Sequence, residues 1–593
     1  MNNVRVNPKL DEVIVNSALW AAAGDALGWI SELTDDKGLR RRIGGSELRE
    51  PVAWKRKIGG ISGVQVPLPA GTYSDDTQLR LAVCRAIRSD GSFDVELFAK
   101  IELTVWPSYA LGAGRGSKAA ASNLTRRDVN WFSNFFVNDG RSYIEGGGNG
   151  AAMRIQPHVW HRGGGEDRAY LIDVIRDSVT THGHMLGLCG AVFHADCLAY
   201  TMRQGEAPGP EEWMRFVDGL KGIEGVIRED FQLGRFWLSA WEQASKRTLS
   251  DAIGEVAAEI RRDIIKLREV SPNWTKSYAD CITILDGYGS RQGTGTNTAL
   301  AAAFLAWAAQ DSPIEDVLRC AANTLGSDTD TIGTMVGALL GALAERSPTW
   351  EVQDRQYIEG QARRLAAIAV RQRVDNFPYP DLIGWQAPST QADAVAETNG
   401  HLALAGLGLA EPVGKGSKAG EFVWQWLKLE FGQTVLCKAR EGNMREMNPS
   451  LMPGPKGISN DSHEGKLIEK SSNAKNPEAE PSEAASPTYF RARDRSYRAT
   501  LAGRAVERDL FDDSGKDRNV GGDRAAHTEP SATERPPVNI NALTDVAIRS
   551  GFDATTIGDC FLACIDDEQG IEHGIGFAAI LAKAYLARKR KRG

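Results

Sequence analysis

The 593-residue sequence has few cysteines and none of the spacings that most cysteine chemistry requires. Its eight cysteines are scattered, mostly through apolar helical segments, and no two of them form a Cys-x-x-Cys pair. This pattern argues against a cysteine-ligated zinc site and against a dithiol redox centre. It predicts reduced, buried thiols in a cytosolic protein.

The sequence also lacks a signal-peptide core and a strong charge of either sign. No apolar run approaches the roughly 20 residues that cross a bilayer. Acidic residues outnumber basic residues by only 77 to 70. This balance gives no overall electrostatic argument for nucleic-acid binding. We therefore expect a soluble, cytoplasmic protein that does not interact with membranes.

The chain is too long for one ordinary core and predicts two or three structured units. Residues 8–390 are rich in Ala, Leu and small residues at helical spacing, which predicts an α-helical domain. Its first helix is expected to start near Leu10, to run toward Gly24 and to place Asp25 near its end. Further helices are expected from Thr77, from Ala299 and from Ile332.

Three segments of different composition follow this domain. In residues 395–445, the alternating, aromatic run 421–431 and the run 434–438 predict a small β element. Its Trp424 and Trp426 favour core packing over a recognition surface. Residues 446–538 are polar with few core-forming side chains, which predicts a disordered linker.

Residues 539–593 predict two or three short amphipathic helices that end in a basic run, residues 588–592. About 50 residues make a small independent fold, so this tail is expected to need a protein or nucleic-acid partner, or its own oligomer. A solvated helix end is the commoner explanation of the basic run.

Two short acidic clusters stand far apart, at residues 74–77 and 326–333. Both offer carboxylate and hydroxyl oxygens, as in Asp328 and Asp330, without an interleaved Cys or His. Mg²⁺, Mn²⁺ and Ca²⁺ prefer such donors. Helix capping is the competing interpretation for either cluster alone, since each precedes an apolar run. Together they favour one shared metal site at two helix starts.

Five motifs occur in order between residues 8 and 375 of this chain. They are Gly24-Asp25-Ala26-Leu27-Gly28 with Glu32, Tyr73-Ser74-Asp75-Asp76-Thr77, Gly148-Asn149-Gly150-Ala151-Ala152-Met153-Arg154, Thr181-His182-Gly183-His184 and Gly326-Ser327-Asp328-Thr329-Asp330-Thr331. This series closely resembles the ADP-ribosylglycohydrolases, which include the dinitrogenase-reductase-activating glycohydrolase and enzymes that remove ADP-ribose from arginine or serine. The resemblance implies an all-α, compact multi-helix domain, to which this chain adds the small β element and the short helical C-terminal segment.

By resemblance, the two acidic clusters hold two divalent cations, Mg²⁺ or Mn²⁺. The family more often has threonine where Ser74 stands, and serine keeps the hydroxyl. The ligands implied are Ser74, Asp75, Asp76, Asp328, Asp330 and Thr331. Glu32 matches a family acidic residue close to the metals and is the first choice for the general acid or base, with Asp75 and Asp330 less favoured. Asp25 resembles a helix-end residue that organises this region.

Glycine-rich loops are expected to bind the diphosphate of ADP-ribose, because glycine lets backbone N–H groups approach phosphate oxygens closely. By resemblance, His182 lies near the phosphates or the distal ribose, and Tyr288 is a stacking residue, although ordinary packing explains it nearly as well. The residues expected to contact ADP-ribose are Gly114, Gly116, Gly148, Asn149, Gly150, His182, Tyr288 and Ser327.

The leading hypothesis is a metal-dependent hydrolase that cleaves the glycosidic bond between ADP-ribose and an acceptor. The alternative is a binding or adaptor protein that senses ADP-ribose or a nucleotide with little turnover. Both acidic clusters and Glu32 are retained, which favours the enzyme. The acceptor stays open among arginine, serine, a nucleic-acid group and free ADP-ribose derivatives.

Overall fold

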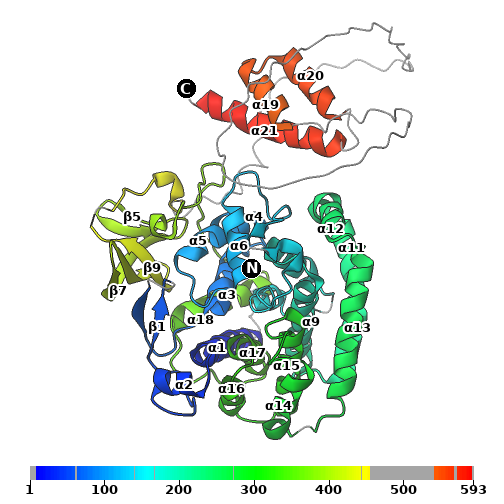
Figure 1. Ribbon diagram of the computed structural model, residues 1–593, viewed down its shortest axis with the longest axis vertical. Helices are drawn as coiled ribbons and strands as arrows, with labels where there is room; N and C mark the ends of the chain where they lie inside the picture. Colours follow the sequence, from blue (N-terminus) through cyan, green and yellow to red (C-terminus); the bar gives the residue numbers. More distant parts are fainter. Residues whose placement is uncertain are drawn as a thin grey trace, which may run out of the picture. The chain divides into compact units, whose positions relative to one another are not determined.

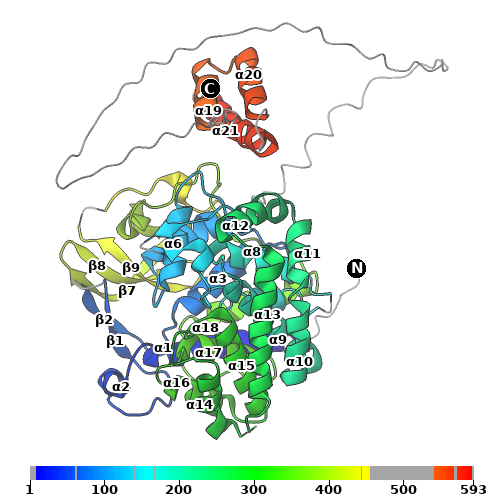
Figure 2. The same cartoon turned by 45° about the vertical axis from the view of Figure 1, so that its right-hand side comes forward.

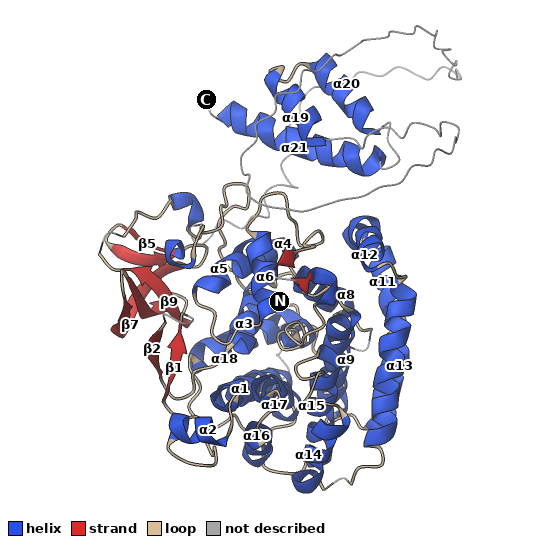
Figure 3. Ribbon diagram, viewed as in Figure 1, coloured by secondary structure: helices blue, strands red, loops and turns tan. Residues whose placement is uncertain are grey.

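The computed structural model describes residues 8–59, 63–138, 141–165, 167–271, 273–442, 444–454, 540–565 and 570–590. The chain divides into two compact units, Met1–Lys475 and Asn476–Gly593. The larger unit is mostly helical, with most of its strands gathered along one edge (Figure 3). Its helices are α1 (Pro8–Ser31), α2 (Asp36–Ile43), α3 (Asp75–Ala86), α4 (Val95–Leu97), α5 (Leu103–Val105), α6 (Arg115–Leu124), α7 (Gln156–Trp160), α8 (Leu171–Thr181), α9 (Met185–Gln204), α10 (Pro210–Gly219), α11 (Gly222–Glu229), α12 (Leu238–Ser245), α13 (Leu249–Leu267), α14 (Trp274–Ile284), α15 (Gly295–Ala309), α16 (Ile314–Asn323), α17 (Thr329–Gly341) and α18 (Arg355–Ala369).

Helices α1 and α17 lie side by side in the core of this unit (Figure 1). Glycines on both helices face the crossing: a Cβ atom on Gly24 would lie 2.1 Å from the carbonyl oxygen of Gly333. A Cβ atom on Gly28 would lie 2.2 Å from the carbonyl oxygen of Thr329. The two backbones therefore touch because these positions carry no side chain.

The expected end of the first helix near Gly24 is wrong. Helix α1 continues to Ser31, so Asp25 lies inside it and not at its end. Glycine usually weakens a helix, but here it serves the close crossing with α17.

Two helices, at Leu10–Ser31 and Met185–Gln204, are long and apolar enough to cross a membrane. The expectation that no apolar segment reaches this length is therefore wrong for these two. Their apolar windows are 94% and 83% buried inside the larger unit, as in core helices of a folded domain.

Helices α9, α13 and α15 pack against one another beside the α1/α17 pair (Figure 2). Within α9, His194 is buried and its Nε2 lies 3.0 Å from the amide nitrogen of Gln156, from which it accepts a hydrogen bond. Burial lowers the pKa of His194 to about 3, from an ordinary value of 6.5. His194 is therefore neutral in the folded protein at neutral pH.

This buried histidine should make stability depend on pH. Between the folded and unfolded pKa values the unfolded state binds more protons, so His194 lowers the free energy of unfolding as pH falls below about 6.5. From pH 7 to pH 5 we expect a loss of about 2 kcal/mol from this residue. Urea titrations at both pH values measure this loss as the difference in pH dependence between wild type and His194→Gln. The variant His401→Gln, at an exposed histidine, is the control. An equal pH dependence in wild type and His194→Gln contradicts the prediction.

Five antiparallel strands form the main sheet in the order β5-β6-β7-β8-β9, and β1 and β2 form a separate hairpin. The strands in sequence order are β1 (Trp54–Ile58), β2 (Val64–Leu68), β3 (Val137–Asn138), β4 (Arg141–Ser142), β5 (Val395–Thr398), β6 (His401–Leu404), β7 (Gly408–Ala419), β8 (Phe422–Leu429) and β9 (Thr434–Arg440). Trp424 on β8 is buried.

The main sheet belongs to the same compact unit as the helices. Arg85 of α3 is fully buried and donates to Gln433, at the turn between β8 and β9, over 2.7 Å. Both oxygens of Glu102 accept from the same guanidinium, at 2.7 and 2.8 Å. An unpaired buried arginine is costly, so this network ties the sheet firmly to the helical core.

The start of the segment predicted as a linker is also part of the larger unit. The N–H of Gly406 donates to the carbonyl of Leu451 over 2.7 Å, and Met447 is buried. Residues 446–454 therefore complete the folded body and are not a linker. Residues 455–538 of the predicted linker lie outside the described residues.

The smaller unit contains α19 (Ile540–Arg549), α20 (Ala554–Ile565) and α21 (Gly570–Arg590). Its core is small and consists of Ala547, Cys560, Cys564, Phe577 and Leu581. All eight cysteines of the chain are free, and only Cys320 is partly exposed.

Candidate active site

The two acidic clusters meet in one cavity of about 410 Å³. It lies where the starts of α3 and α17 face the end of α1 and the glycine-rich loops at residues 112–116 and 146–150. The lining residues are Glu32, Leu33, Asp75, Asp76, Gly112, Gly114, Arg115, Gly116, Ser117, Glu145, Gly146, Gly147, Gly148, Asn149, Gly150, Met153, His182, Gln292, Gly293, Ser327, Asp328, Asp330 and Thr331.

Asp25 orders the first acidic cluster from inside α1. Its carboxylate accepts the backbone N–H groups of Ser74 and Thr77, each over 2.9 Å, and the Thr77 hydroxyl over 2.6 Å. The Ser74 hydroxyl caps α3 by accepting the N–H of Asp76. Because Asp25 and Ser74 satisfy these free donors, Asp75 and Asp76 are left to face the cavity.

The second cluster begins α17, with Asp328 at its N-cap position. The Thr329 hydroxyl donates to the carbonyl of Gly28 over 2.8 Å, which fixes this helix start on α1. Asp328 Oδ2 accepts from the side-chain amide of Asn149 over 2.7 Å, which joins the cluster to the glycine loop. The Thr331 hydroxyl lies 3.5 Å from Asp76 Oδ1 and links the two clusters.

Carboxylates in this cavity are buried close to one another. Burial, followed by the charges of Glu32 and Asp25, raises the pKa of Asp75 to about 8. Burial is also the main reason that the pKa values of Asp76 and Asp330 stand well above the ordinary value, with neighbouring carboxylates adding to it. A cavity that crowds several acidic groups favours a bound cation.

Glu32 follows the end of α1 and faces Arg56 of strand β1. Burial raises the pKa of Glu32 to about 7, while Arg56, at 3.7 Å, opposes this rise. The Arg56 guanidinium lies over Trp29, 5.0 Å from the ring centroid, and Trp29 packs edge-on against Trp54. Glu32 is thus held against the cavity by a stacked arginine and can exchange a proton near neutral pH.

The glycine-rich loop at residues 146–150 forms the wall facing the acidic clusters. The N–H of Asn149 donates to the carbonyl of Gly293 over 3.0 Å. A Cβ atom on Gly150 would lie 2.9 Å from both the His182 ring and the Ser117 hydroxyl, so any other residue there would force these side chains to shift. Burial lowers the pKa of His182 to about 3, so its imidazole is neutral.

A family model for ADP-ribosylglycohydrolase matches residues 8–374. The chain belongs to the ADP-ribosylglycohydrolase family. The matched residues contain every side chain that lines the cavity. The family resemblance inferred from the motifs is therefore confirmed, and so is the mostly helical fold with a small C-terminal sheet.

The individual proteins that are similar to this one include a curated protein and a solved structure. The uncharacterized protein YegU of Escherichia coli (strain K12) is 24% identical over 337 residues, which cover 56% of this chain and 87% of that protein. A solved structure described as an ADP-ribosylglycohydrolase-related protein complex is 21% identical, with a TM-score of 0.41, and the match covers 61% of this chain and 99% of that chain.

Two of the predicted site residues do not line the cavity. Ser74 is fully buried, and its hydroxyl caps α3 by accepting the N–H of Asp76. Tyr288 is 45% exposed and lies outside the lining residues, although its ring approaches Gly326. The remaining predicted metal, catalytic and ADP-ribose residues all face the cavity.

No pattern in the sequence indicated that Arg56 belongs to the site. Arg56 lies on strand β1, and the residue that it pairs with, Glu32, lies just after helix α1. The role of Asp25 was signalled by its place in the first motif, but its hydrogen bonds follow from the long-range packing of α1 against α3.

The cavity residues fit a divalent cation by chemistry. The donors are carboxylate and hydroxyl oxygens, which hard cations prefer. Among the described residues, Asp76 Oδ2 has no hydrogen-bond partner although it is buried, an arrangement that a cation would relieve. In the described part of the chain, no three His, Cys, Asp or Glu side chains already stand in an arrangement that would hold a metal ion.

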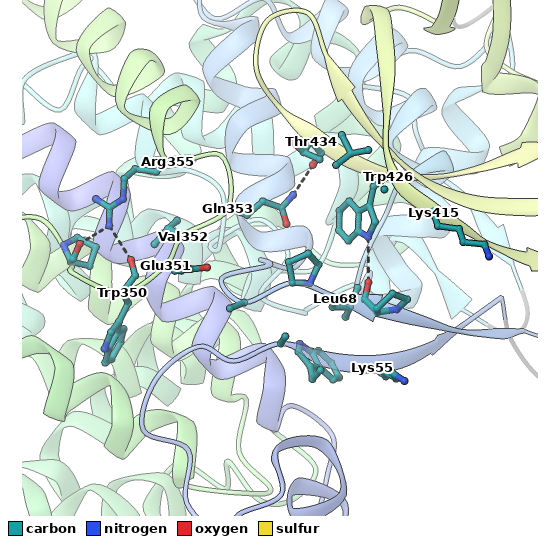
Figure 4. A pocket seen from close by; sticks show the side chains of 18 of the residues that line it. Lys55, Leu68, Trp350, Glu351, Val352, Gln353, Arg355, Lys415, Trp426 and Thr434 are labelled. Carbon is teal, nitrogen blue, oxygen red and sulfur yellow. Dashed lines mark hydrogen bonds between the residues drawn. The ribbon is translucent and has the colours of Figure 1, made fainter.

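A larger cavity, of about 1030 Å³, lies between the β1–β2 hairpin, the main sheet and residues 348–355 (Figure 4). Trp426 reaches it from the sheet and donates to the carbonyl of Pro67 over 3.3 Å. Trp54, which packs on Trp29, contributes to its lining. None of the predicted site residues lines it.

Proposed function

We propose that this protein is a divalent-metal-dependent hydrolase that releases ADP-ribose from a modified acceptor by cleaving the glycosidic bond. One observation carries the proposal: two acidic helix starts far apart in the sequence, together with Glu32, converge on a single cavity opposite a glycine-rich loop. Family membership supports a glycohydrolase role, and the family is generally dependent on divalent metal ions.

The proposed ion ligands are Asp75, Asp76, Asp328, Asp330 and Thr331. When bound, Mg²⁺ or Mn²⁺ would offset negative charge and activate water near the anomeric carbon. The buried carboxylates stabilise the positive charge that develops on the ribose as the bond breaks.

Glu32 is the proposed proton donor or acceptor. A pKa of about 7 lets this side chain give a proton to the departing acceptor or take one from the attacking water. Arg56 holds the carboxylate in place and keeps its pKa from rising further.

The glycine loops are the proposed diphosphate site. Gly148 and Gly150 allow close approach of the backbone, and Gly114 at the start of α6 adds a helix N-terminus, which favours anions. The neutral ring of His182 lies directly behind Gly150 and fixes the position of this loop.

Purified protein with Mg²⁺ or Mn²⁺, assayed against ADP-ribosylated arginine, serine and nucleic-acid acceptors, tests the proposal. We expect release of ADP-ribose from at least one acceptor and loss of release with EDTA. Failure on every acceptor, together with retained ADP-ribose binding by calorimetry, supports the alternative of a binding or adaptor protein.

We also propose that the C-terminal segment recruits a protein or nucleic-acid partner and is not needed for hydrolysis. A variant that ends after Gly454 should cleave a small ADP-ribosylated substrate at a rate within about twofold of the full chain. A variant that ends after Glu441 removes buried Met447 and should lose stability, by about 2 kcal/mol or more. Comparing thermal midpoints and cleavage rates checks both expectations. Loss of cleavage in the longer variant would contradict the proposal.

A further inference from the structure

Leu33 has a backbone conformation that is unfavourable for leucine. It follows Glu32 directly and lines the acidic cavity. Its φ angle is 50°, in the left-handed region where leucine is disfavoured. Glycine is the usual residue for such a conformation just after a helix.

Packing does not account for the leucine either. Its side chain is 73% exposed, so it buries little apolar area in the folded protein. The other exposed residues that line the cavity have polar or no side chains: Gly114, Arg115, Glu145 and Gln292. The one other large apolar lining side chain, Met153, is buried. Among the residues that the structure describes, Leu33 is therefore the apolar element of the cavity rim.

We propose that Leu33 is a specificity-determining residue that contacts the acceptor and favours one with an apolar surface beside the glycosidic bond. The inference rests on the proposed function. Because Leu33 adjoins Glu32, a group that leaves past the Glu32 carboxylate passes Leu33. An aliphatic or aromatic side chain next to the modified residue would remove the exposed leucine from water on binding. The strained backbone is then a local cost of presenting this contact.

Two peptides with the same ADP-ribosylated residue, arginine or serine as the acceptor assay dictates, test this inference. One carries phenylalanine on both sides of that residue and the other carries glycine. We expect the wild-type protein to prefer the phenylalanine peptide. Leu33→Gly should lower kcat/KM for that peptide about tenfold, mainly through KM, and change the glycine peptide little. Its thermal midpoint should stay equal or rise, because glycine relieves the strain.

Lys246→Gly is the matched control. Lys246 is exposed, has a φ of 55° and ends α12, and it lies outside the cavity. This variant should also keep or raise the thermal midpoint but leave kcat/KM unchanged for both peptides. Equal loss on both peptides in Leu33→Gly, or no loss on either, overturns the inference while leaving the hydrolase intact. No cleavage of either peptide by the wild type contradicts the proposed function itself.

Discussion

Replacing Asp328 and Asp330 together with asparagine is expected to lower the release of ADP-ribose by about 1,000-fold or more. Both side chains face the cavity from the start of α17. Asparagine keeps their size but removes two negative charges from the proposed cation site. The carbonyl of an asparagine at position 328 still accepts the hydrogen bond that Asn149 gives in the wild type. The change therefore removes charge and little else.

The fold should survive this double change. The pKa of Asp330 is raised chiefly by burial and then by the neighbouring Glu32 and Asp76 carboxylates. A neutral amide avoids this unfavourable burial of charge, so the thermal midpoint without metal should stay equal or rise. Mn²⁺ should raise the midpoint of wild type but not of the double variant.

Asp316→Asn, on the surface of α16, is the matched control and should behave like wild type in both assays. Undiminished release of ADP-ribose by the double variant would contradict the hydrolase proposal. Lost release with intact ADP-ribose binding places the defect in the reaction and not in recognition.

The parts of the site that depend on local sequence could be predicted. Ser74 and Asp328 each precede an apolar helical run, and both stand at the N-cap of a helix. The strands β8 and β9 could be predicted in the same way from the runs 421–431 and 434–438, because the pattern of a strand is set by neighbours in the chain.

The parts of the site that depend on contacts between distant elements could not be predicted from the sequence. Gly24 has the same local signature whether it ends a helix or faces another backbone, and only the α1/α17 crossing decides between them. The sequence does not show which group the Ser74 hydroxyl contacts, and at the start of α3 it accepts the N–H of Asp76. The position of Arg56 against Glu32 depends on how the β1–β2 hairpin packs on α1, which no local pattern encodes.

The close contact of α1 and α17 at their glycines predicts a large loss of stability in the variant Gly24→Ala. The added methyl group would lie 2.1 Å from the carbonyl oxygen and 2.5 Å from the carbonyl carbon of Gly333. Both atoms belong to the backbone of α17, so no side-chain rotation relieves the clash and the two core helices must separate. We expect a loss of about 3 kcal/mol or more in the free energy of unfolding. Urea titration and the yield of soluble protein measure it.

Gly254→Ala is the control: the same substitution at this position should raise the stability of the protein. Gly254 is exposed within α13, and no atom of the described part of the chain lies within 4 Å of an added Cβ. Alanine there should stabilise the protein by about 0.5 to 1 kcal/mol, because glycine is the poorer helix former. The two variants differ only in what faces the glycine. If Gly24→Ala were as stable as wild type, the close crossing of α1 and α17 would be wrong. The cavity would then lose its basis, because Asp25 and Asp330 are positioned by these two helices.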